Sequence, residues 1–145
     1  MKNEVVAKAE VIVAKKASGG NDGHCVVTTI DENGYPVPST VYVAKADGIR
    51  RFIFGAVLDS DRVKRIKKCN RTCVCVNSDE YHMAFVGTME VLADPQSKLD
   101  AWNVRFEEYF SGSDDPNFCA LRFTTERYSL YLSDEDEDTG IFPKE

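Results

Sequence analysis

Short runs of β-branched and aromatic residues recur along most of this chain, and turn-forming residues separate them. Such runs are typical of strands when clusters of Gly, Pro, Asn or Asp bound them. Strands are therefore expected over residues 24–30, 39–44, 49–55, 72–77, 82–93, 118–124 and 127–132. Many short strands with few helices between them predict a small antiparallel β-barrel of six to seven strands, mostly β with flanking helices.

Single residues refine this prediction. The pair Asn33-Gly34 favours a tight turn with positive φ between the first two strands. Pro36 and Pro38 lack a backbone donor, so the stretch that they flank should be the start or the edge of a strand. Gly87 interrupts the long fifth strand, a position that favours a bulge or a sharp barrel bend.

Two segments have the apolar spacing of amphipathic helices. The first covers residues 3–16 and ends at the breaker cluster of residues 18–23; its apolar positions are Val5, Val6, Ala9, Ile12 and Val13. The second begins with Asp94 as cap and Pro95 at the first helical position. Its expected buried side consists of Leu99, Trp102, Phe106, Tyr109 and Phe110.

A third helix, short and basic, is expected directly after the strand at 49–55. Ser60 is a good N-cap, and Val63 and Ile66 form one buried side. Its opening turns carry Arg62, Lys64 and Arg65. Cations beside the exposed N–H groups and the positive dipole end of a helix attract anions, phosphate above all. A solvated surface helix would carry the same residues, so both interpretations stay open at this point.

Length and charge limit the function. The 145 residues are expected to form one domain over 1–145, with an N-terminal helix and loop at 1–20 and an acidic, flexible tail at 133–145. The net charge of −6 argues against a nucleic-acid partner, which needs a basic surface. Acidic residues 134–138 are expected to stay solvated and fray. With no apolar run near the roughly 20 residues of a membrane span, and no signal peptide, a cytoplasmic protein is expected.

The cysteines are expected to be free thiols. Their number is odd in a chain without an export signal, and they are Cys25, Cys69, Cys73, Cys75 and Cys119. A zinc site would require Cys-x-x-Cys turns and further ligands at matching spacing, which His24 and His82 do not provide. We therefore interpret the cysteines as small core residues and expect no metal site.

Four local patterns, in order, carry a resemblance to a known family. Residues 27–36 (VTTIDENGYP) resemble its opening strand and turn, and residues 52–54 followed by 60–63 (SDRV) resemble its phosphate segment. Residues 86–94 (VGTMEVLAD) resemble a later strand, and Trp102 with residues 109–116 resembles the segment after it. Over residues 25–132 the chain thus resembles the FMN-binding split barrels related to pyridoxamine 5′-phosphate oxidase, in particular the general stress protein branch.

The resemblance implies a homodimer of split barrels with two flavin sites at the subunit interface. FMN is the implied cofactor, with FAD or a deazaflavin as alternatives. By the resemblance, Ser60 and Arg62 hold the flavin phosphate, with Ala56, Val57 and Lys64 nearby. The strand residues Ser39, Thr40 and Val41 run beside the isoalloxazine ring, and Trp102 comes from the other subunit.

The function expected from the resemblance is an FMN-dependent oxidoreductase acting on a small molecule. Pyridoxamine 5′-phosphate oxidase activity itself is not expected, because the acidic tail offers no basic segment for a substrate phosphate. The alternative is a split barrel without flavin that acts as a binding or structural dimer. Ser39, where the family usually has Arg, and Asp61 before Arg62 favour this alternative.

Overall fold

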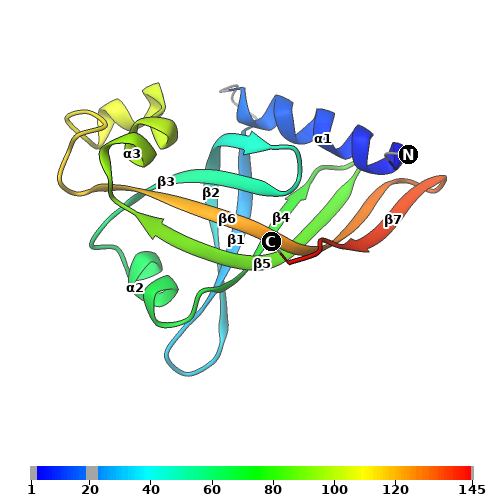
Figure 1. The fold of residues 1–145 in the computed structure, drawn as a ribbon, viewed down its shortest axis with the longest axis horizontal. Coiled ribbons are helices and arrows are strands. Elements are labelled where there is room, and N and C mark those ends of the chain that lie inside the picture. Colours follow the sequence, from blue (N-terminus) through cyan, green and yellow to red (C-terminus); the bar gives the residue numbers. More distant parts are fainter. Residues whose placement is uncertain (1–2, 19–22, 145) are drawn as a thin grey trace.

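The computed structural model describes residues 3–18 and 23–144, and in that part of the chain seven strands form one antiparallel sheet. They are β1 (His24–Ile30), β2 (Pro36–Asp47), β3 (Arg51–Val57), β4 (Arg71–Asn77), β5 (His82–Leu92), β6 (Phe118–Ser133) and β7 (Asp136–Ile141). The order is β3-β2-β1-β4-β5-β6-β7, and β3 also pairs with β6. This pairing closes six strands into a barrel and leaves β7 outside it (Figure 1), so the predicted antiparallel barrel is confirmed.

Aromatic side chains fill the barrel. Phe52, Phe54, Phe85 and Phe123 are fully buried, and the Phe52 ring lies 5.1 Å from Phe85 and 6.0 Å from Phe123 between centroids. Burying one such side chain contributes roughly 1.5–3 kcal/mol. Because side chains occupy the interior, room for a ligand is left on the outer surface.

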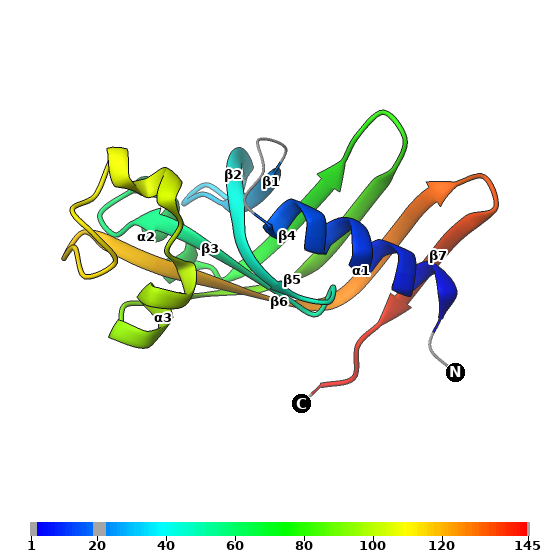
Figure 2. The same ribbon diagram turned by 90° about the horizontal axis from the view of Figure 1, so that it is seen from above.

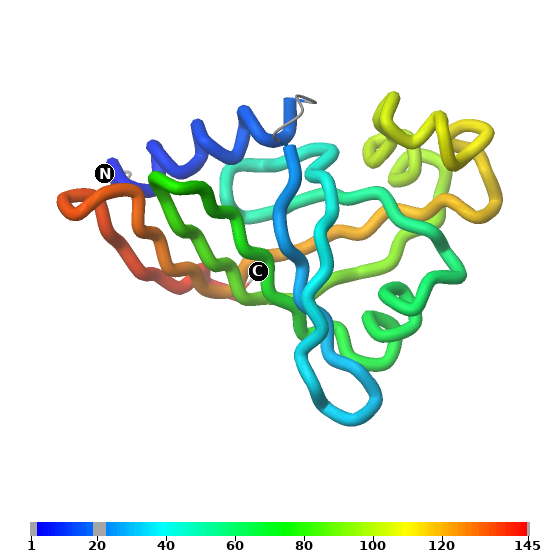
Figure 3. The backbone as a smooth tube through the Cα atoms, turned by 180° about the vertical axis from the view of Figure 1, so that it is seen from behind, coloured from blue at the N-terminus to red at the C-terminus, as the bar shows by residue number. Residues whose placement is uncertain are grey.

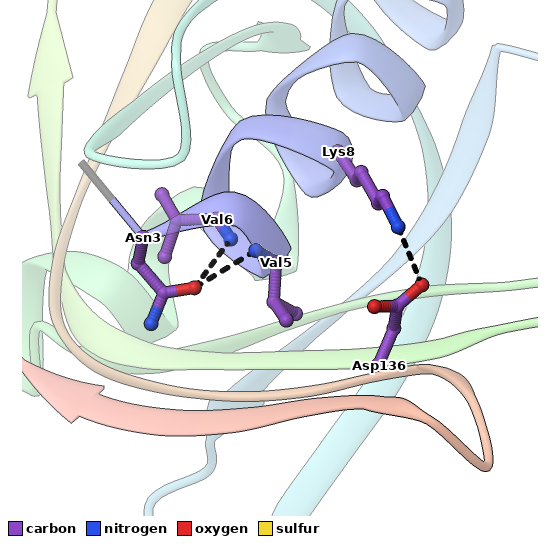
Figure 4. Close-up of polar contacts among 5 residues, drawn as sticks. All are labelled: Asn3, Val5, Val6, Lys8 and Asp136. Carbon is purple, nitrogen blue, oxygen red and sulfur yellow. Dashed lines mark hydrogen bonds and ion pairs between the residues drawn. The ribbon is translucent and has the colours of Figure 1, made fainter. Parts of the chain in front are cut away.

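Helix α1 (Glu4–Ala17) lies across one end of the barrel strands (Figures 1 and 3), as the sequence predicts. The Asn3 side chain caps it by accepting hydrogen bonds from the amides of Val5, at 2.8 Å, and Val6, at 3.3 Å (Figure 4). Ala9 and Val13 are buried in the main core. Figure 3 also shows the β1–β2 hairpin projecting from the barrel, where Gly34 has a φ of 83°.

The acidic run differs from the expected frayed tail, because β7 begins inside it and pairs with β6. Strand alternation turns Asp136 and Asp138 toward the first turns of α1. Lys8 forms an ion pair of 2.8 Å with Asp136 (Figure 4), and Asn3 Nδ2 donates to Asp138 at 2.7 Å. Carboxylates are favoured beside a cation at a helix N-terminus. The expectation that residues 134–138 stay solvated does not take this strand alternation into account.

Helix α2 (Asp61–Lys68) closes the core at another point of the barrel. The Ser60 side chain accepts a hydrogen bond from the Val63 amide at 3.3 Å, and Val63 and Ile66 are buried in the main core. The predicted cap and buried side are therefore confirmed.

The long second helix predicted from Asp94 is wrong beyond its first turns. Helix α3 (Pro95–Ala101) begins with Asp94 as cap, at 3.0 Å from the Ser97 amide, but Trp102 is extended. Asn103 then caps a separate 3-10 helix, η1 (Val104–Glu108). Two of the expected buried residues are exposed, Leu99 to 58% and Tyr109 to 74%.

The other three residues of that expected face share an aromatic cluster instead. The rings of Trp102, Phe106 and Phe110 lie 5.2, 5.4 and 5.0 Å from the ring of buried Phe118. A bend in the chain brings these three rings to one side of the molecule, as a single helix with this spacing would also do. The spacing alone therefore does not distinguish the bend from a single helix. This cluster packs α3 and η1 on the outside of β3 and β6, at the opposite end of the molecule from β7 (Figure 2).

The two last strands predicted from the sequence are one continuous strand, β6. At the expected break, the Thr125 amide donates to the carbonyl of Arg50 at 2.8 Å, and Thr125 Oγ1 donates to the carbonyl of Ile49 at 2.6 Å. These two bonds go to the turn before β3 and not to β5, and they keep β6 continuous where the sequence predicts a break. The register of β5 against β6 shifts between Val86 and Gly87, so the predicted bulge is confirmed.

Strand bounds also differ for β2 and β3. β2 begins at Pro36 and extends beyond the predicted 39–44, and its ladder with β3 starts only at Val43. At Pro36 and Pro38, β2 pairs only with β1 and its other side is an open edge. This is the position that their missing backbone donors predict. β3 runs two residues further than predicted and includes Ala56 and Val57.

All five cysteines are free thiols, as predicted. No helix within residues 3–18 and 23–144 is long and apolar enough to cross a membrane. Across the same residues, no three His, Cys, Asp or Glu side chains gather as a metal ion would require.

Replacing Gly87 with Ala should destabilise the barrel. A Cβ at this position would lie 1.9 Å from the backbone oxygen of Thr124, so two strands would have to separate. Forcing extra atoms into a packed site costs about 1–3 kcal/mol. Urea unfolding of Gly87→Ala against wild type measures the change. Gly112→Ala, whose Cβ would meet only the mobile end of Asp114 at 3.0 Å, is the control and should change stability far less.

Two thiols should be unreactive in the folded protein. Burial raises the pKa of Cys25 to about 12 and that of Cys119 to about 11. Since the thiolate is the reactive form, iodoacetamide at pH 8 should modify both only after unfolding. Mass spectrometry of the labelled peptides, with and without urea, measures this, and half-buried Cys69 serves as the internal reference. Equal labelling of Cys25 and Cys69 in native protein would contradict the expectation.

Candidate functional site

A groove of about 370 Å³ lies outside the barrel where β2, β3, α2 and η1 meet. Its volume is within the range of roughly 300–1,000 Å³ that small-molecule sites occupy. The lining residues are Thr40, Val41 and Tyr42 of β2, Gly55, Ala56 and Val57 of β3, Arg62 of α2, Arg105 and Phe106 of η1, and Tyr109 and Phe110 after η1.

Gly55 sets how close η1 lies to the barrel wall. A Cβ at this position would be 2.6 Å from the Phe106 ring and 2.9 Å from the Phe118 ring. A glycine lets the aromatic cluster pack directly on β3. The aromatic wall of the groove therefore stands close to its strand floor.

Arg62 provides a cation at one end of the groove. Its Nε donates to the Ser39 hydroxyl at 3.0 Å, and it makes no other hydrogen bond to the residues that the structure describes. Burial, and secondly repulsion from Arg65, lower the pKa of Arg62. Both effects disfavour the charged guanidinium, and an anion beside it would offset them.

The other cations of α2 face a different groove. Arg65 Nε donates to the Thr29 hydroxyl at 2.8 Å, and Arg65 and Lys64 line a groove of about 350 Å³ together with Asp61. Helical spacing explains the division, because neighbouring positions of one helix point to different sides. Asp61 is therefore turned toward Lys64 and Arg65 and away from the groove that Arg62 lines.

Arg105 brings a second positive charge to the groove that Arg62 lines. Its guanidinium lies 4.4 Å over the centre of the Tyr42 ring, a cation–π contact that joins η1 to β2. None of the described residues that line this groove carries a carboxylate, although the chain as a whole has a net charge of −6. Two cations beside aromatic walls suit a flat ligand with an anionic group.

The structure brings together five of the nine residues named from the resemblance, namely Thr40, Val41, Ala56, Val57 and Arg62. Ser39 contacts the groove through Arg62, and Ser60 caps α2 beside it. Lys64 lies in the other groove. Trp102 packs within its own chain against Phe118, so its contact with a flavin of the partner subunit stays a prediction.

Sequence reasoning did not include the aromatic wall in the site. The residues missed are Tyr42, Gly55, Arg105, Phe106, Tyr109 and Phe110. The apolar spacing places Phe106, Tyr109 and Phe110 on a buried helical face instead. Asn103 is a cap-forming residue and could have indicated that a new helix starts there, but nothing local predicts that Arg105 lies over Tyr42.

The family described as pyridoxamine 5′-phosphate oxidase matches residues 21–131. A solved structure from Clostridium acetobutylicum, of a protein related to general stress protein 26 of Bacillus subtilis, is 30% identical with a TM-score of 0.80. The match covers 97% of this chain and 96% of that one. No curated protein matches the chain.

Two further structures share the fold at low identity. A heme binding protein from Mycobacterium smegmatis has a TM-score of 0.70 at 13% identity, over 97% of this chain and 59% of that one. A pyridoxamine 5′-phosphate oxidase-related, FMN binding protein from Nostoc punctiforme has a TM-score of 0.64 at 13% identity, over 99% and 100%. With the family match and the barrel topology, these likenesses lead to one conclusion: the chain belongs to the pyridoxamine 5′-phosphate oxidase family of split barrels, with relatives of general stress protein 26 among its structural neighbours.

Proposed function

We propose that this protein binds FMN in the groove that Arg62 and Arg105 line, and that it acts as an oxidoreductase on a small molecule. The observation that carries the proposal is the lining itself, which combines two arginines with aromatic walls and, among its described residues, no carboxylate. A family relative from Nostoc punctiforme is an FMN binding protein, which supports the same ligand.

The flavin phosphate would bind at the Arg62 end. Ser39 accepts from Nε and so orients the guanidinium, while its terminal nitrogens remain able to donate to phosphate oxygens. A hydrogen bond between charged groups contributes about 1.5–3 kcal/mol. Asp61 does not oppose this, because it lines the groove of Lys64. Ser39 and Asp61, which favoured a flavin-free protein at first, are thus compatible with phosphate binding.

The isoalloxazine ring would lie along β2 and β3 against the aromatic wall. The small side chains of Thr40, Val41 and Ala56 leave a flat floor there. Bound FMN would supply hydride or electron transfer, and the protein would hold and shield the ring. Arg105 adds positive charge, which favours a ligand that carries or gains negative charge.

A second copy of the chain would cover the open side of the groove. Three residues that line it are exposed in the single chain: Val57 to 38%, Tyr42 to 44% and Tyr109 to 74%. Exposed aromatic residues around a ligand groove are typical of a protein interface. We therefore propose a homodimer with a flavin at each of two equivalent interface grooves.

Replacing Arg62 with Ala should weaken FMN binding about tenfold to a hundredfold, because one charged hydrogen bond to phosphate is lost. Riboflavin lacks the phosphate, so its affinity should be the same for wild type and Arg62→Ala. Quenching of flavin fluorescence during titration measures both ligands, and the visible spectrum of the purified protein identifies any flavin or heme that it carries.

Lys64→Ala is the matched control, because it removes a cation of the same helix that lies in the other groove. FMN affinity should change less than twofold for this variant. An unchanged FMN affinity in Arg62→Ala would refute the phosphate assignment. A wild-type protein that binds neither FMN nor riboflavin would support the flavin-free alternative. A heme spectrum from the purified protein would show that the cofactor is heme and not FMN.

A further inference from the structure

Another groove, of about 940 Å³, shares no residue with the proposed flavin groove. We propose that it binds a small molecule with at least two negative charges, of the phosphate-bearing class. Five cationic side chains line it, namely Arg50, Arg51, Arg122, Arg127 and Lys144. Among the described lining residues, Glu90 and Glu126 oppose them, which leaves an excess of three positive charges there in a chain with a net charge of −6.

Strand register places the floor of this groove on the outer face of the barrel. Thr88 of β5 is the register partner of Thr124 of β6, and Thr124 is also the partner of Arg51 of β3. These positions alternate with fully buried Phe52 and Phe123, so they face away from the core. Two hydroxyl groups and an arginine therefore lie side by side across three hydrogen-bonded strands.

The C-terminal segment forms one wall, and specific contacts hold it there. Just after β7 the chain is still bonded to β6, because the Phe142 amide donates to the carbonyl of Glu126 at 2.7 Å. Arg50 lies 4.8 Å over the centre of the Phe142 ring and donates to the Pro143 carbonyl at 3.5 Å. Arg50 thus helps to fix the wall that carries Lys144.

The two glutamates of the lining neutralise only part of its positive charge. Arg122 forms an ion pair with Glu90 at 3.0 Å, and both side chains are partly exposed. Arg127 and Lys144 are exposed and form no ion pair with the residues that the structure describes. Arginine and lysine around threonine hydroxyls are the donors that phosphate groups prefer in proteins. An excess of three charges fits a dianion or trianion better than a single carboxylate.

The test is titration of the full chain with inorganic pyrophosphate by calorimetry at low ionic strength. Removing two cations with Arg127→Ala and Lys144→Ala together should weaken binding about tenfold or more. The pair Lys15→Ala and Lys67→Ala removes the same charge from exposed helix positions outside this groove and should change binding less than twofold. Glu126→Gln removes an opposing charge and should tighten binding about threefold, a gain that misfolding cannot produce.

The site is independent of the proposed flavin groove, and Arg62→Ala separates the two. Pyrophosphate affinity that stays at the wild-type value in this variant supports the proposal, and affinity lost with Arg62 would assign pyrophosphate to the flavin groove instead. The proposal is also overturned if no binding heat appears, or if both double variants lose affinity equally. A double variant at Arg127 and Lys144 that changes the oligomeric mass would identify the groove as a protein contact.

Discussion

The pairing of β3 with β6 is the interaction on which the rest of this structure depends. Seven residue pairs, from Arg51 with Thr124 to Val57 with Phe118, join strands that lie far apart in the sequence and close the barrel. Without this pairing, β3 and the first half of β6 would each leave unpaired backbone groups at an open edge, and closure removes those edges. It also places the two grooves. One end of β3, at Arg51, borders the groove of about 940 Å³ that Arg127 and Lys144 also line (the cationic groove), and the other end, at Gly55 to Val57, borders the proposed flavin groove.

Local chemistry was enough to predict most of the fold. Ser60 and Asp94 cap helices as expected, Gly87 lies at a bulge, and the apolar spacing of the first helix is correct. The errors arose where distant segments decide the local structure. Thr125 stays in a continuous strand because its amide and hydroxyl bond to the turn between β2 and β3. No window of sequence around Thr125 contains that partner.

The candidate site was predictable to a lesser degree. Arg62 could be named because a capped basic helix has a recognisable pattern, but its contact with Ser39 joins residues 23 positions apart. The other half of the groove depends on the bend at Trp102, which turns η1 toward β2 and sets Arg105 over Tyr42. Periodicity alone predicts one helix in this region, and it therefore predicts core residues where the wall of the site lies.

The arrangement of charge has a consequence for how any anion would be recognised. With a net charge of −6, the protein as a whole repels anions, but at physiological salt this repulsion is screened beyond about 8 Å. Inside a groove the nearest groups dominate, and both the proposed flavin groove and the cationic groove have more cations than carboxylates among their described residues. Affinity would therefore depend on a few arginines held by neighbours, as Ser39 holds Arg62, rather than on the field of the whole molecule. Such local recognition selects a ligand by where its negative charge lies. A protein with two separate anion sites would need this selection to direct a different ligand to each site.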